Sequence, residues 1–120
     1  MSAPNIVNVS NIIAKTTGAD LDTTLTTSLL ANAASSGKVF KVNTIIVCNV
    51  DGSAAANLSL EHYDGTNSRR IASTISIPAN TTLVALDKNS VIYLEEGHSI
   101  RGGASALGDL ECLISYEEIS

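Results

Sequence analysis

Apolar and polar residues alternate along most of this chain, and turn-forming residues interrupt the alternation about every ten residues. Successive side chains of a β-strand point to opposite faces of a sheet, so the pattern predicts short strands. No segment has the 3.6-residue period of a helix. The expected strands cover residues 6–17, 23–33, 39–50, 56–63, 69–77, 81–86, 91–94, 98–104 and 110–116.

This rhythm predicts an all-β fold, an antiparallel β-sandwich that is jelly-roll-like and has about eight or nine short strands. A parallel α/β sheet would need crossover helices, for which no segment has the pattern. The 120 residues are expected to form a single domain with one core. Residues 1–10 either pair inside this sandwich or extend as an N-terminal arm to a neighbouring subunit.

Two of the strands have patterns that assign their faces. The turn residues Asp64-Gly65-Thr66-Asn67 predict a hairpin between segments 56–63 and 69–77. In segment 69–77 the odd positions are mostly apolar, so an aspartate at Ile75 should prevent folding and one at Thr74 should be tolerated. In segment 39–50 one face should carry Lys41, Asn43 and Asn49, and the core-facing set should be Phe40, Val42, Ile46, Cys48 and Val50.

The composition predicts a thin aliphatic core. Aromatic residues make up 3% of the chain, and there is no Trp. Small side chains bury less apolar area per ordered residue, so an isolated monomer should be modestly stable. Contacts between subunits would add to that stability, and a small symmetric homo-oligomer is expected.

The charge argues against nucleic acid as a partner. The net charge is −5, and the seven Lys and Arg residues are spread along the chain, with Arg69-Arg70 as one adjacent pair. The first residues lack the basic and apolar stretches of a signal peptide or membrane helix, so we expect synthesis in a cytoplasm and no membrane partner. Cys48 and Cys112 lie in strand patterns and should be small buried hydrophobes without a disulfide.

No constellation of residues predicts catalysis or cofactor binding. His62 and His98 lack the spacing of a metal motif, and His62 should be a partly buried structural residue. Neighbouring carboxylates such as Glu95-Glu96 point to opposite faces of a strand and cannot converge on a substrate. Gly102-Gly103 has no following helix or Lys, so it is not a phosphate loop. We therefore expect no enzyme activity, cofactor or metal.

Four segments together cover most of the chain: SAPNIVNVS, SSGKVFKVNTIIVCNVDGS, STISIPANTTLVALDKNSVIYLEEGHSIR and LECLISYEEIS. They resemble small virion structural proteins of marine tailed phages, including those that infect cyanobacteria. The resemblance implies a non-enzymatic virion protein, foremost a capsid decoration or cement subunit whose partner is the major capsid protein. A neck, tail or baseplate subunit is the alternative within this class. A carbohydrate-binding jelly roll on a host-attachment fibre is the alternative outside it.

The chain ends are the predicted contact segments, because strand-like ends can pair with the edge of a neighbouring sheet. Such contacts would hold the protein in the virion. The residues expected in this interface are Pro4, Ile6, Val7, Val9, Tyr116, Glu117 and Ile119.

Overall fold

The computed structural model describes residues 8–120, and all of its regular elements are β-strands. No helix in this range is long and apolar enough to cross a membrane. The strands are β1 (Ile12–Asp20), β2 (Ser28–Ala31), β3 (Val39–Asn49), β4 (Ala56–Tyr63), β5 (Ser68–Ile77), β6 (Thr82–Leu86), β7 (Ile92–Leu94), β8 (Ser99–Ala104) and β9 (Leu110–Ile119).

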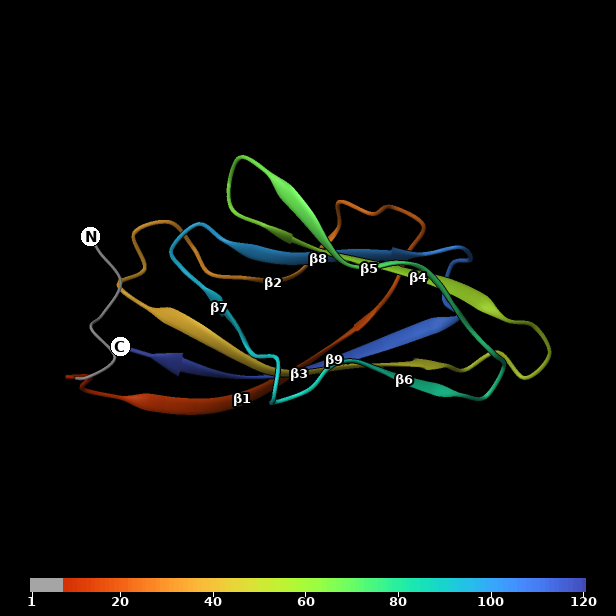
Figure 1. Ribbon diagram of the computed structural model, residues 1–120, viewed down its shortest axis with the longest axis horizontal. Helices are drawn as coiled ribbons and strands as arrows, with labels where there is room; N and C mark the ends of the chain where they lie inside the picture. Colours follow the sequence, from red (N-terminus) through yellow and green to blue (C-terminus); the bar gives the residue numbers. More distant parts are fainter. Residues whose placement is uncertain (1–7) are drawn as a thin grey trace.

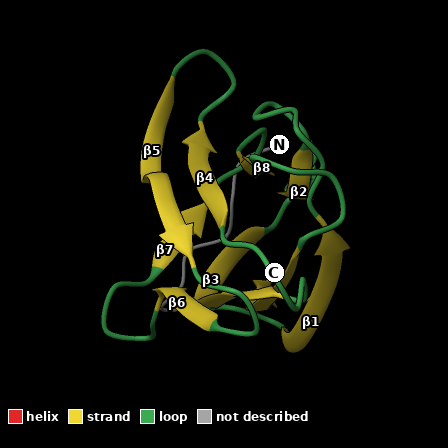
Figure 2. Ribbon diagram, turned by 90° about the vertical axis from the view of Figure 1, so that its right-hand side faces the viewer, coloured by secondary structure: helices red, strands yellow, loops and turns green. Residues whose placement is uncertain are grey.

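The strands form two antiparallel sheets packed face to face (Figures 1 and 2). The five-stranded sheet has the order β1-β9-β3-β6, with β7 also paired to β3, and the four-stranded sheet has the order β2-β8-β4-β5. The pairing is nested, because β1 pairs with β9, β2 with β8, β3 with β6 and β4 with β5. The predicted antiparallel β-sandwich of eight or nine strands is confirmed, with nine strands among residues 8–120.

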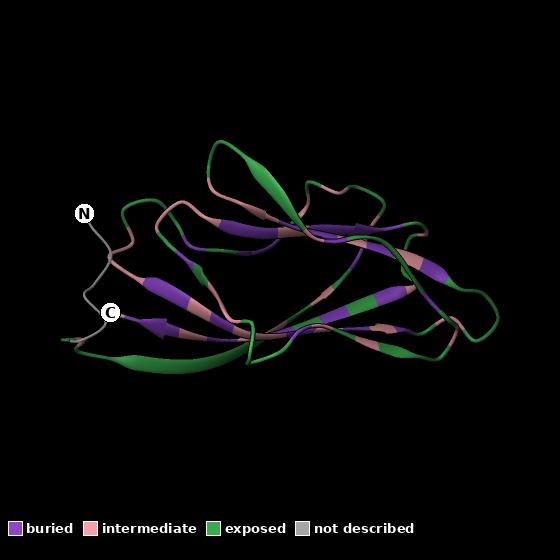
Figure 3. Ribbon diagram, viewed as in Figure 1, coloured by how far each residue is buried: buried purple, intermediate pink, exposed green. Residues whose placement is uncertain are grey.

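The core between the sheets is aliphatic, as the composition predicted. Both sheets contribute buried residues to it (Figure 3). One aromatic pair, Phe40 and Tyr116, adds to it with ring centroids 5.2 Å apart. Burying a Leu, Ile or Val side chain contributes about 1.5–3 kcal/mol, so this layer is the main source of stability. Its fully buried aliphatic residues include Leu21, Val42, Ile45, Val47, Leu58, Leu60, Ile77, Leu94, Ile100, Leu110 and Ile114.

The face assignment of β3 is wrong beyond Val42. The register with β9 shifts between Val42 and Thr44, and such a β-bulge moves every later side chain to the other face. Asn49 is consequently buried, and its amide nitrogen donates to the carbonyls of Ala54 (3.0 Å) and Ile77 (2.9 Å). The residues predicted for the core that face outward or lie partly exposed are Ile46, Cys48 and Val50.

The face assignment of β5 also fails at Ile75. The register with β4 shifts between Leu58 and Leu60, and Thr74 opposite this shift has a φ of 52°. A β-branched residue adopts that left-handed conformation only under strain. Ile75 is therefore 39% exposed, whereas Ala72 and Ile77 on either side of the irregularity are buried. The predicted Asp64–Asn67 turn is confirmed, because Asp64 Oδ1 accepts hydrogen bonds from the amides of Thr66 and Asn67.

The first strand runs later in the sequence than predicted. Gly18-Ala19-Asp20, expected as a break, continues β1 because all three pair with β9. β2 is shorter than expected and covers Ser28–Ala31 only.

The corrected register of β5 gives a first prediction. Ile77→Asp should lower the free energy of unfolding by several kcal/mol, because Ile77 is 1% exposed and a buried carboxylate there has no partner. Ile75→Asp should cost much less, about 1 kcal/mol or under, since its side chain already reaches water. Urea unfolding of both variants measures the difference. Equal losses would contradict the observed register.

Candidate interaction surface

An apolar row crosses the outer face of the five-stranded sheet. Ile46 on β3 is the register partner of Leu113 on β9 and of Val84 on β6. Leu113 is 47% and Val84 57% exposed, although alternation should place polar residues on a face turned to water. We call Leu113, Ile46 and Val84 the apolar row.

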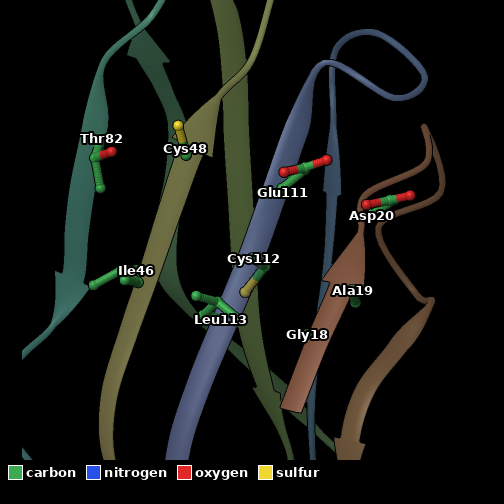
Figure 4. A pocket seen from close by; sticks show the side chains of 9 residues that line it. All are labelled: Gly18, Ala19, Asp20, Ile46, Cys48, Thr82, Glu111, Cys112 and Leu113. Atoms are coloured by element: carbon green, nitrogen blue, oxygen red, sulfur yellow. The ribbon is translucent and has the colours of Figure 1, made fainter. Parts of the chain in front are cut away.

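The apolar row ends at a glycine on the edge strand. Gly18 on β1 is the register partner of Leu113, and a Cβ at position 18 would lie 3.2 Å from Leu113 Cδ2. Leu113 therefore packs closely over the backbone of Gly18, where any side chain would crowd it. The hollow there has a volume of about 440 Å³ (Figure 4) and is lined by Gly18, Ala19, Asp20, Ile46, Cys48, Thr82, Glu111, Cys112 and Leu113.

Two carboxylates lie at one end of this hollow. Asp20 on β1 and Glu111 on β9 are register partners, and Figure 4 shows their side chains next to each other. Both are exposed. The three ion pairs among residues 8–120 involve other carboxylates, those of Glu118 and Glu61. The outer face therefore has a negative end beside an apolar middle.

On its other side the apolar row is bordered by hydroxyl groups. Thr16, Ser115 and Thr44 are register partners on β1, β9 and β3. Thr16 Oγ1 and Ser115 Oγ lie 3.3 Å apart and share a hydrogen bond. Small polar groups therefore border the apolar row on this side.

The lining of the hollow offers carboxylate, hydroxyl and thiol groups beside apolar side chains. It contains no His, Lys or Arg. Burial raises the pKa of the Cys112 thiol to about 12, so this group stays a neutral, unreactive thiol. Cys48 is partly exposed on the outer face, and both cysteines are free. In the range that the structure covers, no three or more His, Cys, Asp or Glu gather as a metal site.

The predicted interface residues fall into three groups. Pro4, Ile6 and Val7 lie outside the described residues, and Val9 is half-buried. The other three, Tyr116, Glu117 and Ile119, lie on β9.

The expectation that Tyr116–Ser120 offers a free edge is wrong, because β9 is paired to β1 on one side and to β3 on the other. Ser120, which follows β9, is also hydrogen-bonded within the chain, because the amide of Ser10 donates to its carbonyl at 2.7 Å. Tyr116 and Ile119 are buried in the monomer. Glu117 is half-buried and accepts a hydrogen bond from Asn43 at 2.9 Å.

Sequence reasoning missed the apolar row, although one signal was present. Ile45-Ile46-Val47-Cys48 is a run of four apolar residues, so at either register an apolar pair must face outward. The partners of Ile46 on β6 and β9 come from distant segments, and their alignment across the sheet cannot be read from the sequence.

A pair of histidines at the other sheet was also missed. His62 Nε2 on β4 lies 3.2 Å from His98 Nδ1 in the turn before β8. Burial lowers the pKa of His62, and the charge of His98 lowers it further. His62 is half-buried, as predicted.

Comparisons with known proteins identify no family. No protein-family model matches the sequence, and no curated protein matches it significantly. Two solved structures are similar, both of them described as a pentameric capsid protein isolated from metagenomic phage sequences. Each alignment covers 87% of this chain, with TM-scores of 0.43 and 0.40 and identities of 16% and 15%. The chain spans 60% and 64% of their lengths. TM-scores below 0.5 at such identity establish neither topology nor function for this chain.

The histidine pair makes stability depend on pH. Because the folded pKa of His62 is lowered, the unfolded chain binds its proton more readily, and stability falls as pH drops through the ordinary value of 6.5. We expect the His62→Gln variant to lose less stability than the original chain between about pH 8 and pH 5. Urea unfolding at both pH values measures this. The same loss in both proteins would show that the pair does not contribute.

Proposed function

We propose that this chain is a non-enzymatic structural subunit of a phage particle, located in the virion. In this role it decorates the capsid and stabilises the shell through contacts with neighbouring subunits. The observation that carries the proposal is the apolar row, which lies on the side of the sheet turned away from the chain's own core. The resemblance of four sequence segments to phage virion proteins is the reason for proposing that the particle is a phage virion.

The energetics of the apolar row favour a protein that works in an assembly. Covering a Leu, Ile or Val side chain contributes up to about 1.5–3 kcal/mol, and the isolated chain gains none of this for the exposed part of the row. Its own core contains little aromatic area to compensate. A neighbouring subunit on this face would therefore add stability to both partners.

The N-terminal segment is the second element of the proposal. Residues 1–10, including Pro4, Ile6 and Val7, reach a neighbouring subunit as an arm attached to the single sandwich domain. In support, the backbone at Ser10 and Asn11 is anchored to Ser120 by three hydrogen bonds of 2.7–3.0 Å. That anchor gives an arm a defined starting point.

The copy number of this chain in purified particles of the phage that encodes it tests the function. Quantitative mass spectrometry should find it at a copy number similar to that of the major capsid protein. A few copies per particle would place it in the neck, tail or baseplate. Glycan binding by the purified chain would favour the attachment-fibre alternative, and absence from particles would overturn the proposal.

Substituting two residues of the apolar row should impair assembly into particles and leave folding intact. A Leu113→Ser/Val84→Ser variant should keep its free energy of unfolding within about 1 kcal/mol, because both side chains are half exposed. Its incorporation into particles should fall several-fold in competition with the original chain. Leu107→Ser is the matched control, since Leu107 is 75% exposed in the loop before β9, off the sheet face. Equal incorporation of all three proteins would count against this face.

Deletion of residues 2–7 tests the arm separately. The truncated chain keeps Ser10 and Asn11, so the hydrogen bonds to Ser120 remain available and the melting temperature should change little. Its incorporation into particles should fall. If it loads as well as the full chain, the segment has no role in assembly.

A further inference from the structure

The outer face of the five-stranded sheet carries a negative charge that no ion pair within residues 8–120 balances. Asp20 and Glu111 are direct register partners, and like charges opposite each other on a sheet are destabilising. No ion pair among residues 8–120 includes either of them. A cation brought by a partner would relieve this repulsion while the same partner covers the adjacent apolar row.

The opposite side of the sandwich carries an unbalanced positive charge. Arg70 on edge strand β5 is exposed and lines a second hollow, of about 270 Å³, together with Asn57 and Ser59 on the outer face of the four-stranded sheet. Its register partner Glu61 is already held by Arg101 at 2.8 Å. Within the part of the chain that the structure describes, Arg70 therefore has no ion-pair partner.

We propose that the outer face of the five-stranded sheet docks a second copy of this chain, which presents Arg70 to Asp20 and Glu111. This inference rests on the proposed function and names one partner of the same face. The two outer faces point in opposite directions from the sandwich (Figure 1), so copies can stack head to tail.

The proposed contact joins two different surfaces, because Arg70 lies on the other sheet from Asp20 and Glu111. The contact is therefore heterologous, joining the acidic face of one copy to the Arg70 side of the next. Such contacts generate closed rings or open filaments.

Charge reversal in purified protein tests the contact. We expect the original chain to self-associate in sedimentation at low salt, and Glu111→Lys and Arg70→Glu each to weaken this association about tenfold. The chain with both substitutions should recover association, and a mixture of the two single variants should form mixed dimers. Lys88→Glu is the matched control, because Lys88 is an exposed cation in the turn between β6 and β7. It should associate like the original chain.

Three outcomes would overturn the inference: a monomeric original chain, single variants that associate normally, or a double variant no better than the singles. Thermal melts of all variants check that they fold, which the exposure of Arg70 and Glu111 favours. The copy number of the chain in particles is measured independently of this experiment. A chain abundant in particles but insensitive to these reversals would keep the proposed function and lose only the head-to-tail contact.

Discussion

The pairing of β9 with two strands from the other end of the chain is the interaction on which the sandwich depends. β9 hydrogen-bonds to β1 along its length on one side and to β3 on the other, while Cys112, Ile114 and Tyr116 point into the core. The carboxylate of Glu118 on β9 also forms ion pairs with Lys15 on β1 at 2.9 Å and with Lys38, the residue before β3, at 3.0 Å. The hydrogen bond from Lys15, aided by that from Lys38, lowers the pKa of Glu118. Partners so far apart in sequence come together only when most of the chain is folded, so this sheet depends on long-range contacts.

The outer surface of this sheet depends on the same strand pairing. The apolar row combines residues from β3, β6 and β9, and the carboxylates beside it come from β1 and β9. Glu111 and Leu113 are two residues apart on β9, and the other groups come from distant parts of the sequence. A change that disturbs the β1–β9 pairing would therefore remove the surface as well as the fold, whereas changes at exposed positions on the face alter the surface alone.

The sequence predicted the strands well and their faces less well. β4 has the predicted bounds, because its alternation and the Asp64–Asn67 turn are local signals. The errors lie in β3 and β5, where register shifts interrupt a period of two that the amino-acid pattern alone would continue. Neither the histidine pair nor the apolar row could be predicted, because both need the alignment of distant strands.

The composition of β3 itself argues that its sheet is covered on both sides. Strands buried on two faces have continuous apolar runs, whereas strands with one wet face alternate. Residues 45–48 of β3 are such a run, yet the four-stranded sheet covers only one side of it. The bulge after Val42 turns Ile45 and Val47 inward and leaves Ile46 and Cys48 outward, and Asn49 enters the core only because two carbonyls accept its amide hydrogens. Within residues 8–120 the outward side of this run stays partly exposed, and in the assembly proposed above a neighbouring subunit would cover it.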